Sequence, residues 1–385
     1  STKLIDMVRG TAQTLAIASL VGGTAACITN DITSQTTIPL AGKVIDQKLE
    51  GTNDKNISCD YLVVGSGAAS LAFIDTLLTE LPDVKVILVD KHPAPGGHWN
   101  DAYDFVSLHQ PSLLYGVTSK QLEGNWLSCL LKEYILPWNH KATKVQILAY
   151  FKSLVDGWVG KGKVEYYNRC KYDFANENGI HKFYSLNGKK CFNVKVNIKL
   201  INAVLMEPIV PSIHPVDIPI EEGITLSSVN DVFRMNESGL RSDDKRRFLV
   251  MGCGKTGIDT IMYLQREMGV DPDHITWIIS NDMWCLKNSR PRDYAAALLK
   301  FDGDKEKSHL ALEERGGFIR LDESVLPTRF RYAVVTSEDM VILRKVKKVI
   351  RRGRVAAIRR HANQDIFVQF GSDQNPLTIS SAHEN

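Results

Sequence analysis

The sequence has little charge of one sign, few long apolar runs and no regular cysteine spacing. Lys and Arg outnumber Asp and Glu by only three over 385 residues, which gives no argument for a nucleic-acid partner. Outside the N-terminus no apolar run reaches about 18 residues, so we expect no membrane-spanning helix. The seven cysteines include no CxxC pair, which argues against a zinc site, a redox dithiol and a disulfide framework. Scattered thiols favour a reducing, cytoplasmic compartment.

The first 57 residues are expected to form an N-terminal extension. They are rich in Thr, Ser, Gly and Asn, and residues 51–56 have the composition of a loop. Lys3 and Arg9 precede a short apolar run over residues 14–21, a pattern that loosely resembles a signal peptide, although Asp6 interrupts the basic region. Secretion or membrane anchoring through this extension, or an amphipathic helix packed on the main body, therefore stays open beside the cytoplasmic assignment.

A strand, a glycine loop, a helix and a second strand follow one another from residue 61. The apolar run 61–64 is typical of a buried parallel strand. Residues 71–78 carry apolar side chains at helical spacing, and a second strand over residues 86–89 ends at Asp90. This βαβ context is what a dinucleotide-binding fingerprint requires.

Within this pattern each residue type has a physical role. Gly65 permits the tight turn, and Gly67 lets the backbone approach a pyrophosphate at the helix N-terminus. Ser70 takes the place of the usual third Gly or Ala and is small enough for close helix–sheet packing. Asp90 is predicted to accept hydrogen bonds from ribose hydroxyls. The residues predicted to bind this first dinucleotide are Gly65, Ser66, Gly67, Ala68, Ala69, Asp90 and Lys91.

The same pattern occurs a second time, near residue 252. A strand over residues 247–251 enters the loop Gly252-Cys253-Gly254-Lys255-Thr256-Gly257, a helix follows, and the next strand, 275–279, ends at Ser280. An acid at that strand end would favour NAD, so its absence, with basic residues nearby at positions 287, 290 and 292, favours NADP over NAD. The residues predicted to bind this second dinucleotide are Gly252, Gly254, Lys255, Thr256, Gly257, Ser280 and Asn281.

The region between the two motifs is predicted to be mixed. Residues 141–159 have helical periodicity, and short alternating runs over 163–205 predict strands, with a hairpin turn at Asn187-Gly188. Prolines at 208, 211, 215 and 219 predict an extended connector between domains.

Two further segments resemble a known family. Residues 91–99 read KHPAPGGHW, and residues 105–117 read FVSLHQPSLLYGV. They resemble the GG-x-W and L-H-x-P-S-x-x-Y segments of flavin-containing monooxygenases and related class B flavoproteins, and with the glycine motifs the resemblance covers roughly residues 59–350. In that family these segments pass along the isoalloxazine side of FAD. The resemblance implies flavin contacts from Gly97, His98, Trp99, His109, Gln110 and Ser112.

The residue types fit that implication. Paired glycines let backbone N–H groups face a flavin, Trp99 offers a flat apolar surface, and Gln110 and Ser112 offer hydrogen bonds. Trp99 taken alone is as well explained as a core aromatic. His98 and His109 are candidates for proton transfer, although a lone histidine is more often structural.

The chain departs from that family in three places. The A-T-G strand end at the domain crossing is absent from residues 201–208, and so is the Baeyer–Villiger fingerprint. The family's final strand and small-residue helix are not visible after residue 354, where two hairpin-like runs, 355–358 and 366–370, lead to a polar tail. We expect the chain to be incomplete there. The basic stretch 344–360 is interpreted as a solvated face rather than a partner site.

These observations predict an α/β protein with two Rossmann-like dinucleotide-binding domains, an FAD domain with an inserted NAD(P) domain in three-layer ββα and αβα arrangements. The expected boundaries are an extension over 1–57, the FAD domain over 58–207, the NAD(P) domain over 208–340, and a return to the FAD domain over 341–385. The function predicted is an FAD-dependent oxidoreductase that takes hydride from NADPH or NADH and passes electrons to oxygen, as a monooxygenase on a small organic substrate. A flavin reductase or oxidase, and a non-catalytic nucleotide-binding protein, are the alternatives. No metal site is predicted.

Overall fold

The computed structural model describes residues 26–29, 53–110, 112, 115–123, 141–175, 180–204, 217–237, 246–287, 291–360, 365–371 and 373–379. These residues form two compact units. The first unit holds 53–102 and the described residues of 110–204, and the second holds 26–29, 103–109 and the described residues of 217–379.

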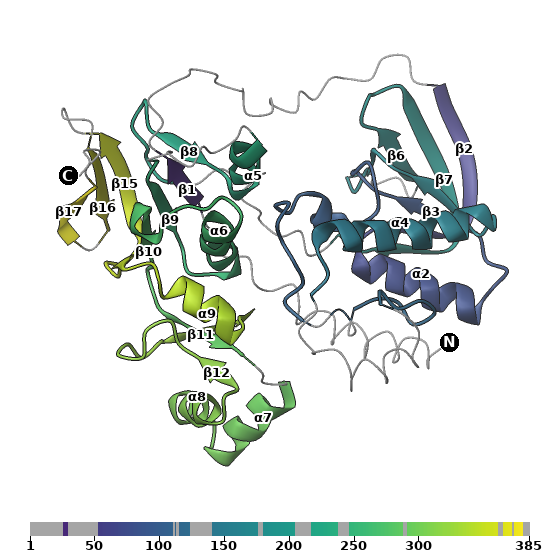
Figure 1. The fold of residues 1–385 in the computed structure, drawn as a ribbon. Helices are drawn as coiled ribbons and strands as arrows, with labels where there is room; N and C mark the ends of the chain where they lie inside the picture. Colours follow the sequence, from purple (N-terminus) through teal and green to yellow (C-terminus); the bar gives the residue numbers. More distant parts are fainter. Residues whose placement is uncertain are drawn as a thin grey trace. The chain divides into compact units, whose positions relative to one another are not determined.

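A six-stranded sheet forms the centre of the first unit (Figure 1). Its order is β4-β3-β2-β7-β6-β5, and only β6 runs against its neighbours. The strands are β2 (Asn53–Val64), β3 (Val86–Val89), β4 (Val164–Tyr167), β5 (Cys170–Tyr172), β6 (His181–Ser185) and β7 (Lys190–Asn202). Helices α2 (Ala68–Glu80) and α4 (Lys144–Gly160) lie side by side on one face.

Side-chain alternation along the central strands explains this layering. Leu62 and Val64 of β2 pack with Phe183 and Phe192 of the β6–β7 hairpin in one buried cluster. Val63, between them, is fully buried but lies outside that cluster, because successive strand side chains point to opposite faces. An apolar strand buried on both faces is the expected pattern for a parallel sheet covered on both sides.

The second unit contains a five-stranded sheet of order β14-β10-β9-β1-β8. Strands β9, β10 and β14 are parallel, and β1 runs antiparallel to both β9 and β8. The bounds are β1 (Ala26–Thr29), β8 (Thr225–Ser227), β9 (Phe248–Met251), β10 (Ile275–Ile278, after the short helix η3, Pro272–His274) and β14 (Lys348–Ile350).

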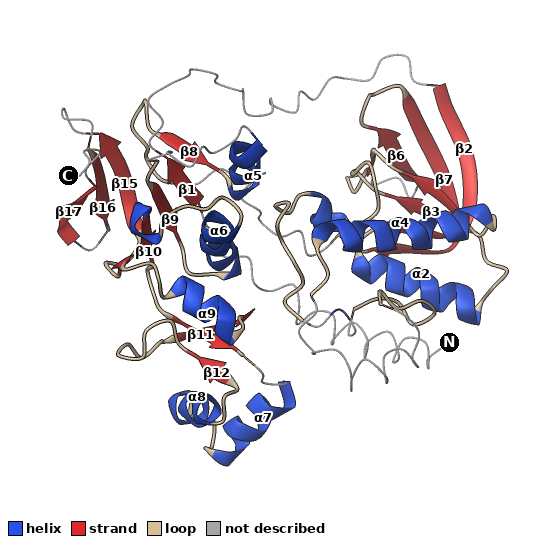
Figure 2. Cartoon of the chain, in the orientation of Figure 1, coloured by secondary structure: helices blue, strands red, loops and turns tan. Residues whose placement is uncertain are grey.

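Two different layers cover this second sheet (Figure 2). Helices α5 (Val229–Glu237), α6 (Lys255–Arg266) and α9 (Ser337–Leu343) contribute to a large buried cluster with Val250 and Trp277. An antiparallel sheet of β15 (Val355–Arg360), β16 (Ile366–Phe370) and β17 (Asp373–Ile379) packs its Ile358 and Val368 against Leu249 and Ile278. The second unit is therefore a three-layer ββα arrangement.

A smaller lobe of the second unit is held by aromatic packing. Helices α7 (Pro291–Lys300) and α8 (Lys305–Glu314) lie beside a small sheet of β11 (Met283–Leu286), β12 (Phe318–Ile319) and β13 (Arg329–Val334). Trp284, Leu312 and Phe318 form its buried core, with Tyr294 and Phe330 packed against them.

The predicted fold class is confirmed by this architecture. Both glycine loops connect a parallel strand to a helix within an α/β unit. The helix predicted over 141–159 is α4, and the predicted hairpin at Asn187-Gly188 joins β6 to β7, with Gly188 at a φ of +70°. The residues at the predicted domain crossing, 205–216, lie outside the described residues, as does most of the predicted extension.

Two expectations about the ends of the chain are wrong. Residues 53–56 were predicted as a loop but belong to β2, where they pair with residues 190–193 of β7. That part of β2 is polar in sequence, and Lys55 and Asn56 are exposed, so no apolar alternation marks it. Residues 341–379 were expected to return to the first unit but belong to the second, because β14 extends its sheet and the β15–β17 sheet covers it. The predicted polar tail includes β17.

Candidate dinucleotide-binding sites

The first glycine loop has the backbone conformation that its sequence predicts. Gly65 has a φ of +95°, and its N–H donates to the carbonyl of Val89 on the neighbouring strand at 2.8 Å. A Cβ at this position would lie 2.7 Å from Cγ1 of Val204, so only glycine fits. Ser70 is 1% exposed, and its hydroxyl donates to the carbonyl of Gly67, which confirms that a small third residue preserves close packing.

The start of α2 is open to an anion. Gly67 is the N-cap, it offers no side-chain cap, and no acidic residue lies in the first turn that Ala68 and Ala69 begin. The first N–H groups of a helix lack partners within the helix and attract negative charge. These features fit a pyrophosphate.

The GGHW segment packs directly on this loop. The N–H of Gly96 donates to the carbonyl of Ser66 at 2.8 Å, and a Cβ on Gly97 would lie 3.0 Å from the Cα of Gly67. Gly97 has a φ of +53° and begins the short helix η1 (Gly97–Asn100). The sequence predicted the glycines of the loop and those of the GGHW segment as separate features. In the structure the two segments contact each other through Gly67 and Gly97.

Asp90 ends β3 as predicted, but its carboxylate is already engaged. One oxygen accepts from the N–H (2.5 Å) and the hydroxyl (2.8 Å) of Ser66. The other accepts from the N–H (2.7 Å) of His92 and lies 2.8 Å from its Nδ1. The side chain of Asp90 is buried, whereas Lys91 beside it is exposed.

His92 continues this network to the flavin-side segment. Its Nε2 lies 2.8 Å from a carboxylate oxygen of Asp101, which directly follows η1. Burial opposes a charge on the ring, but the hydrogen bonds to Asp101 and Asp90 outweigh it and raise the pKa of His92 to about 9. His92 is therefore an imidazolium at neutral pH. No pattern in the sequence predicts a role for His92.

The aromatic residue of the GGHW segment lies in the core. Trp99 is 7% exposed, its indole N–H donates to the hydroxyl of Tyr115 at 3.0 Å, and the His98 ring stacks on it at a centroid distance of 5.5 Å. Trp99 thus acts as a core aromatic, and only a small part of its ring is left for a ligand. His98 is exposed in this structure.

The structure divides the second flavin-side segment between the two units. Residues 103–109, including His109, belong to the second unit, whereas Gln110 and Ser112 belong to the first. Ser112 is 1% exposed, and its hydroxyl accepts a hydrogen bond from the N–H of Ala142 at 2.6 Å. This hydrogen bond gives Ser112 a structural role, because it holds Ala142 two residues before the start of α4. The flavin contacts of His109 and Gln110 stay predictions.

The second glycine loop repeats the backbone of the first. Gly252 has a φ of +108°, and its N–H donates to the carbonyl of Ile278 at 2.8 Å. The indole N–H of Trp277 donates to the carbonyl of Gly252 at 2.8 Å. Gly254 is the N-cap of α6, again without a side-chain cap or an acid in the first turn, which contains Thr256 and Gly257. This helix start also fits an anion.

Lys255 does not point freely to solvent. Its ammonium pairs with Asp259 one turn later, and the two residues are 7% and 8% exposed. The hydroxyl of Tyr103 donates to the other oxygen of Asp259 at 2.7 Å, and Phe105 stacks on Tyr263 with centroids 4.1 Å apart. The segment 103–109, which we call the strap, is thereby anchored on α6. Asp259 therefore competes with the predicted phosphate for the ammonium group of Lys255.

The end of β10 is exposed at Ser280 and Asn281, as a nucleotide-binding edge requires. The next residue, Asp282, is 8% exposed, and Arg351 binds it through two nitrogens at 2.8 and 3.2 Å. Arg351 follows β14 and also reaches Asp322 at 3.3 Å. This arginine was interpreted only as part of a solvated face; a parallel neighbour of β10 could not be located from the sequence.

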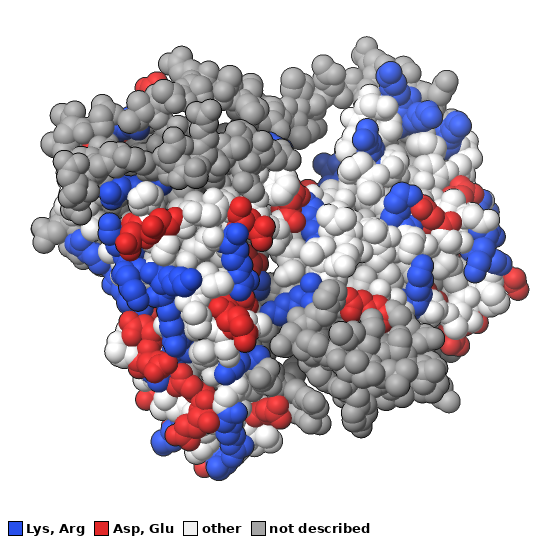
Figure 3. Space-filling model, viewed as in Figure 1, with Lys and Arg blue, Asp and Glu red and all other residues white. Residues whose placement is uncertain are grey.

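Charge over this part of the second unit is mixed rather than of one sign. Basic and acidic side chains alternate on the face shown in Figure 3, and Arg344, like Arg351, has an acidic partner, Glu323. Of the basic residues that favoured NADP, Lys287 follows β11, whereas residue 290 and the side chain of residue 292 lie outside the described residues. The choice between NADP and NAD stays a prediction.

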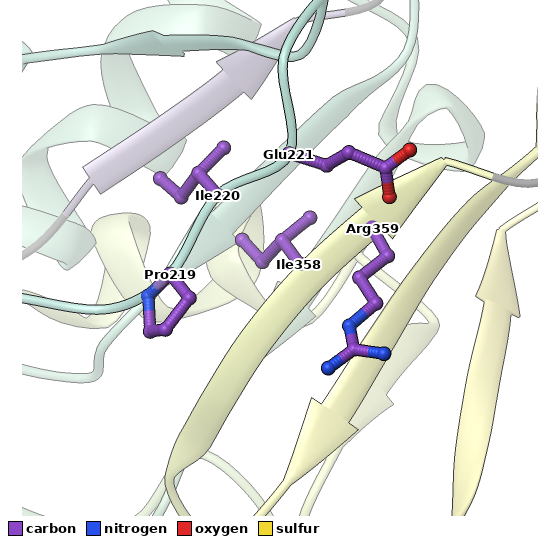
Figure 4. Close-up of a pocket in the computed structure, with 5 residues that line it drawn as sticks. All are labelled: Pro219, Ile220, Glu221, Ile358 and Arg359. Carbon is purple, nitrogen blue, oxygen red and sulfur yellow. The ribbon is translucent and has the colours of Figure 1, made fainter.

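Two cavities in the described residues lie away from both glycine loops. One of about 320 Å³ is lined by Pro219, Ile220, Glu221, Ile358 and Arg359 (Figure 4). Ile220 bridges to Ile358, and the carboxylate of Glu221 accepts from the N–H of Arg360 at 3.0 Å, so this hollow marks the junction with β15. Among the described residues there is no cluster of metal-ligating side chains, and no helix is long and apolar enough to cross a membrane.

Comparison with solved structures finds flavin-dependent monooxygenases at low sequence identity. No family model matches the sequence. The ornithine N-hydroxylase of Kutzneria sp. 744 is 12% identical, with 84% of this chain and 78% of that chain covered and a TM-score of 0.49. An open structure of cyclohexanone monooxygenase is 13% identical, with 81% and 70% covered and a TM-score of 0.44. A flavin monooxygenase of Stenotrophomonas maltophilia is 12% identical, with 83% and 76% covered and a TM-score of 0.41.

Curated relatives by sequence are uncharacterized mycobacterial proteins. One from Mycobacterium tuberculosis and one from Mycobacterium bovis are each 32% identical over 322 residues, which cover 79% of this chain and 56% of the relative. The chain therefore spans just over half the length of the curated relatives it matches.

Proposed function

We propose that this chain supplies the FAD and NAD(P)H sites of a flavin-dependent oxidoreductase that acts on a small organic substrate as a monooxygenase. The observation that carries the proposal is the repeated loop. Gly65 and Gly252 adopt the same left-handed conformation and donate the same 2.8 Å hydrogen bond to the next strand, each before a helix start without a side-chain cap. A fold that repeats this arrangement has two places for a dinucleotide pyrophosphate.

The first site is assigned to FAD because of what packs on its loop. Gly97 approaches Gly67 so closely that a Cβ on Gly97 would lie 3.0 Å from the Cα of Gly67, and the positive φ of Gly97 adds strain for any other residue. Bare backbone on two adjacent segments fits a ligand that needs both N–H donors and close approach. The hydroxyl of Tyr166 on β4 is buried and has no hydrogen-bond partner among the described residues. An orphaned donor of this kind fits a hydroxyl-rich ligand.

The second site is assigned to the nicotinamide cofactor, with NADP favoured. Ser280 and Asn281 are exposed and uncharged, and the carboxylate of Asp282 is bound by Arg351. No free acid is thus left among residues 280–282 to repel a 2′-phosphate.

The chemistry that bound FAD supplies is hydride acceptance from NAD(P)H and electron transfer to oxygen. The residues of this chain bind and orient the two nucleotides: the glycine loops approach the phosphates, and the helix starts offset their charge. His98, exposed beside Trp99, and His109, half-buried at the end of the segment 103–109, are the candidates for moving a proton at an imidazole.

The test is the visible spectrum of the purified protein, followed by anaerobic addition of NADPH. We expect flavin absorbance near about 450 nm that bleaches on NADPH addition, because reduction removes the oxidised chromophore. Flavin that does not bleach would contradict the second site, and protein that takes up no FAD after reconstitution would contradict the first. Product analysis then addresses oxygen use. If peroxide forms in an amount equal to the NADPH consumed with every substrate tried, the protein is an oxidase and the monooxygenase proposal is contradicted.

A further inference from the structure

The inference concerns the acidic residue at the end of β3, and it rests on the proposed FAD site. An ionised carboxylate has about four lone-pair positions for hydrogen bonds. In Asp90 four donors surround them: the N–H and hydroxyl of Ser66, and the N–H and Nδ1 of His92. Asp90 is also 5% exposed. This carboxylate has neither spare acceptor positions nor exposed surface for a ribose. We therefore assign it a structural role within the protein.

The second observation is that the ring of His92 connects Asp90 to Asp101. Both of its ring nitrogens lie 2.8 Å from a carboxylate oxygen, Nδ1 from Asp90 and Nε2 from Asp101. With both nitrogens carrying hydrogen, the ring donates one hydrogen bond to each acid. Asp90 holds Ser66 in the glycine loop, and Asp101 closes the turn after the GGHW segment, where its N–H donates to the carbonyl of His98 at 3.1 Å. The imidazolium is a continuous link between two segments that the chain brings together from 35 residues apart, counting from 66 to 101.

We propose that His92, as an imidazolium between Asp90 and Asp101, is the positioning residue of the first site: it fixes the glycine loop and the GGHW segment in the one arrangement that accepts FAD. Asp90 acts as its anchor rather than as a ribose ligand. His92 does not contact the cofactor in this assignment, and it acts through the loop. The direct docking of Gly96 on Ser66 gives the contact that the link preserves.

Loss of the proton should release this link. Besides Asp90 and Asp101, the ionisable groups near this network are Tyr166 and Cys170 near Asp90, and His98 near the ring. Burial raises the pKa of Tyr166 to about 12, so its hydroxyl stays neutral as His92 titrates, and burial also raises the pKa of the Cys170 thiol. Deprotonation of His92 changes the three-residue cluster from one net negative charge to two beside the loop that would receive phosphates.

The sign of the pH effect follows from linkage. The pKa of His92 is about 9 in the folded protein against an ordinary value of 6.5, so the folded state holds the proton more tightly. The stabilisation is complete below pH 6.5 and is lost as pH rises through 9. The pKa of Asp90 is lowered: burial opposes its charge, but hydrogen bonds from His92 and Ser66 outweigh it. Its contribution is lost only as pH falls through that lowered value.

The first arm of the experiment measures FAD dissociation constants by flavin fluorescence at pH 7 and at pH 9.5 to 10. We expect wild type to bind roughly tenfold more weakly at the high pH, the scale of one charge-assisted hydrogen bond. His92→Gln should be weak at both pH values, and His92→Lys, which keeps the charge, should bind closer to wild type and lose less at high pH. The His92→Gln curve also corrects for ionisation of the ligand. The matched control is His181→Gln, a histidine on β6 of the same unit whose ring forms a hydrogen bond with the hydroxyl of Tyr172.

The second arm needs no cofactor. The imidazole proton signals of the chain are titrated by NMR, with the His92 signal identified by its loss in His92→Gln. We expect it to titrate near pH 9, and lower in Asp101→Asn. A His92 signal that titrates near 6.5, or FAD affinity unchanged in His92→Gln, would overturn the proposal. If wild type binds no FAD while His92 titrates near 9, the proposed FAD site fails but the link itself stands.

Discussion

The two glycine loops have nearly the same backbone and different surroundings. Gly65 and Gly252 share their φ region and their hydrogen bond to the next strand. The first loop is held from outside by Asp90, an acid at the end of the neighbouring strand. The second is followed by a helix that keeps its own ion pair, Lys255 with Asp259, and the position matching Asp90 is not acidic.

The comparison shows that sterics fix the glycine in both loops, whereas the side chains around each loop depend on the chemistry of that site. A loop that leaves a strand and enters a helix after only three residues needs glycine at the positive φ, whatever binds there. The side chains that hold the loop come from other elements and are free to differ. The two motifs should therefore respond alike to glycine substitution and differently to charge substitution.

The largest effect is expected from Lys255→Met. It leaves the carboxylate of Asp259 buried with only Tyr103 as a described partner, and removal of one member of a buried pair costs about 3–5 kcal/mol. We expect that loss in the free energy of unfolding by urea titration. The double variant Lys255→Met/Asp259→Leu should recover most of it, because no unpaired charge is left. A single variant as stable as wild type would show that the pair is not buried in solution.

Substitution of Gly97 should come next. In Gly97→Ala the new Cβ meets the Cα of Gly67 at 3.0 Å, in addition to the strain of a positive φ, so we expect FAD retention to fall at least roughly tenfold and stability to fall by about 1–3 kcal/mol. Gly162→Ala is the control, since Gly162 has a φ of +67° but open space around it. It should show the strain alone and keep FAD. Equal FAD loss in both variants would contradict the close contact.

A smaller effect is expected from Ser280→Asp, which gives the second loop an acid like that of the first. A carboxylate there would repel a 2′-phosphate and accept from a free ribose hydroxyl. We expect the NADPH-to-NADH ratio of kcat/KM for flavin reduction to fall by roughly tenfold, with FAD content unchanged. Asn281→Ser serves as a neutral control. An unchanged ratio would place the 2′-phosphate elsewhere.

The smallest effect is expected from Tyr166→Phe, which should raise the stability of the FAD-free protein and lower its affinity for FAD. Its hydroxyl is buried without a partner, so removing it should raise the stability of the protein without FAD by about 1 kcal/mol. If a ligand hydroxyl normally satisfies it, FAD binding should weaken by a few-fold at the same time. Thermal unfolding with and without FAD measures both. Destabilisation of the FAD-free protein would show that the hydroxyl has a partner.

The sequence predicted what is local. Buried apolar strands, the helix predicted over 141–159, the hairpin at Asn187-Gly188 and both glycine loops depend on side-chain periodicity and backbone sterics. All are present, the helix over 144–160. What it did not predict depends on partners distant in the chain. Asp90 was assigned a ligand because its spacing fits one, but spacing does not show that Ser66 and His92 use the same carboxylate.

Arg351 illustrates the same limit. Its place beside Asp282 follows from β14 lying next to β10, a parallel pairing across about 70 residues. The strap is a further case, since no periodicity tells that Tyr103 reaches Asp259. The polar half of β2 was missed for another reason: it lacks the apolar alternation by which a strand is recognised.

The strap also limits how the two units can be separated by cutting the chain. Residues 103–109 belong to the second unit but are continuous on both sides with the first. No single cut in the chain yields both units whole, and a hybrid made by exchanging residues 217–379 with a relative would place a foreign α6 under the original Tyr103 and Phe105. Such a hybrid needs the strap exchanged together with the helix, as a pair of matched parts. The two units are therefore tied by the strap and by β1, two segments that belong to the second unit but lie before or within the first unit in the sequence.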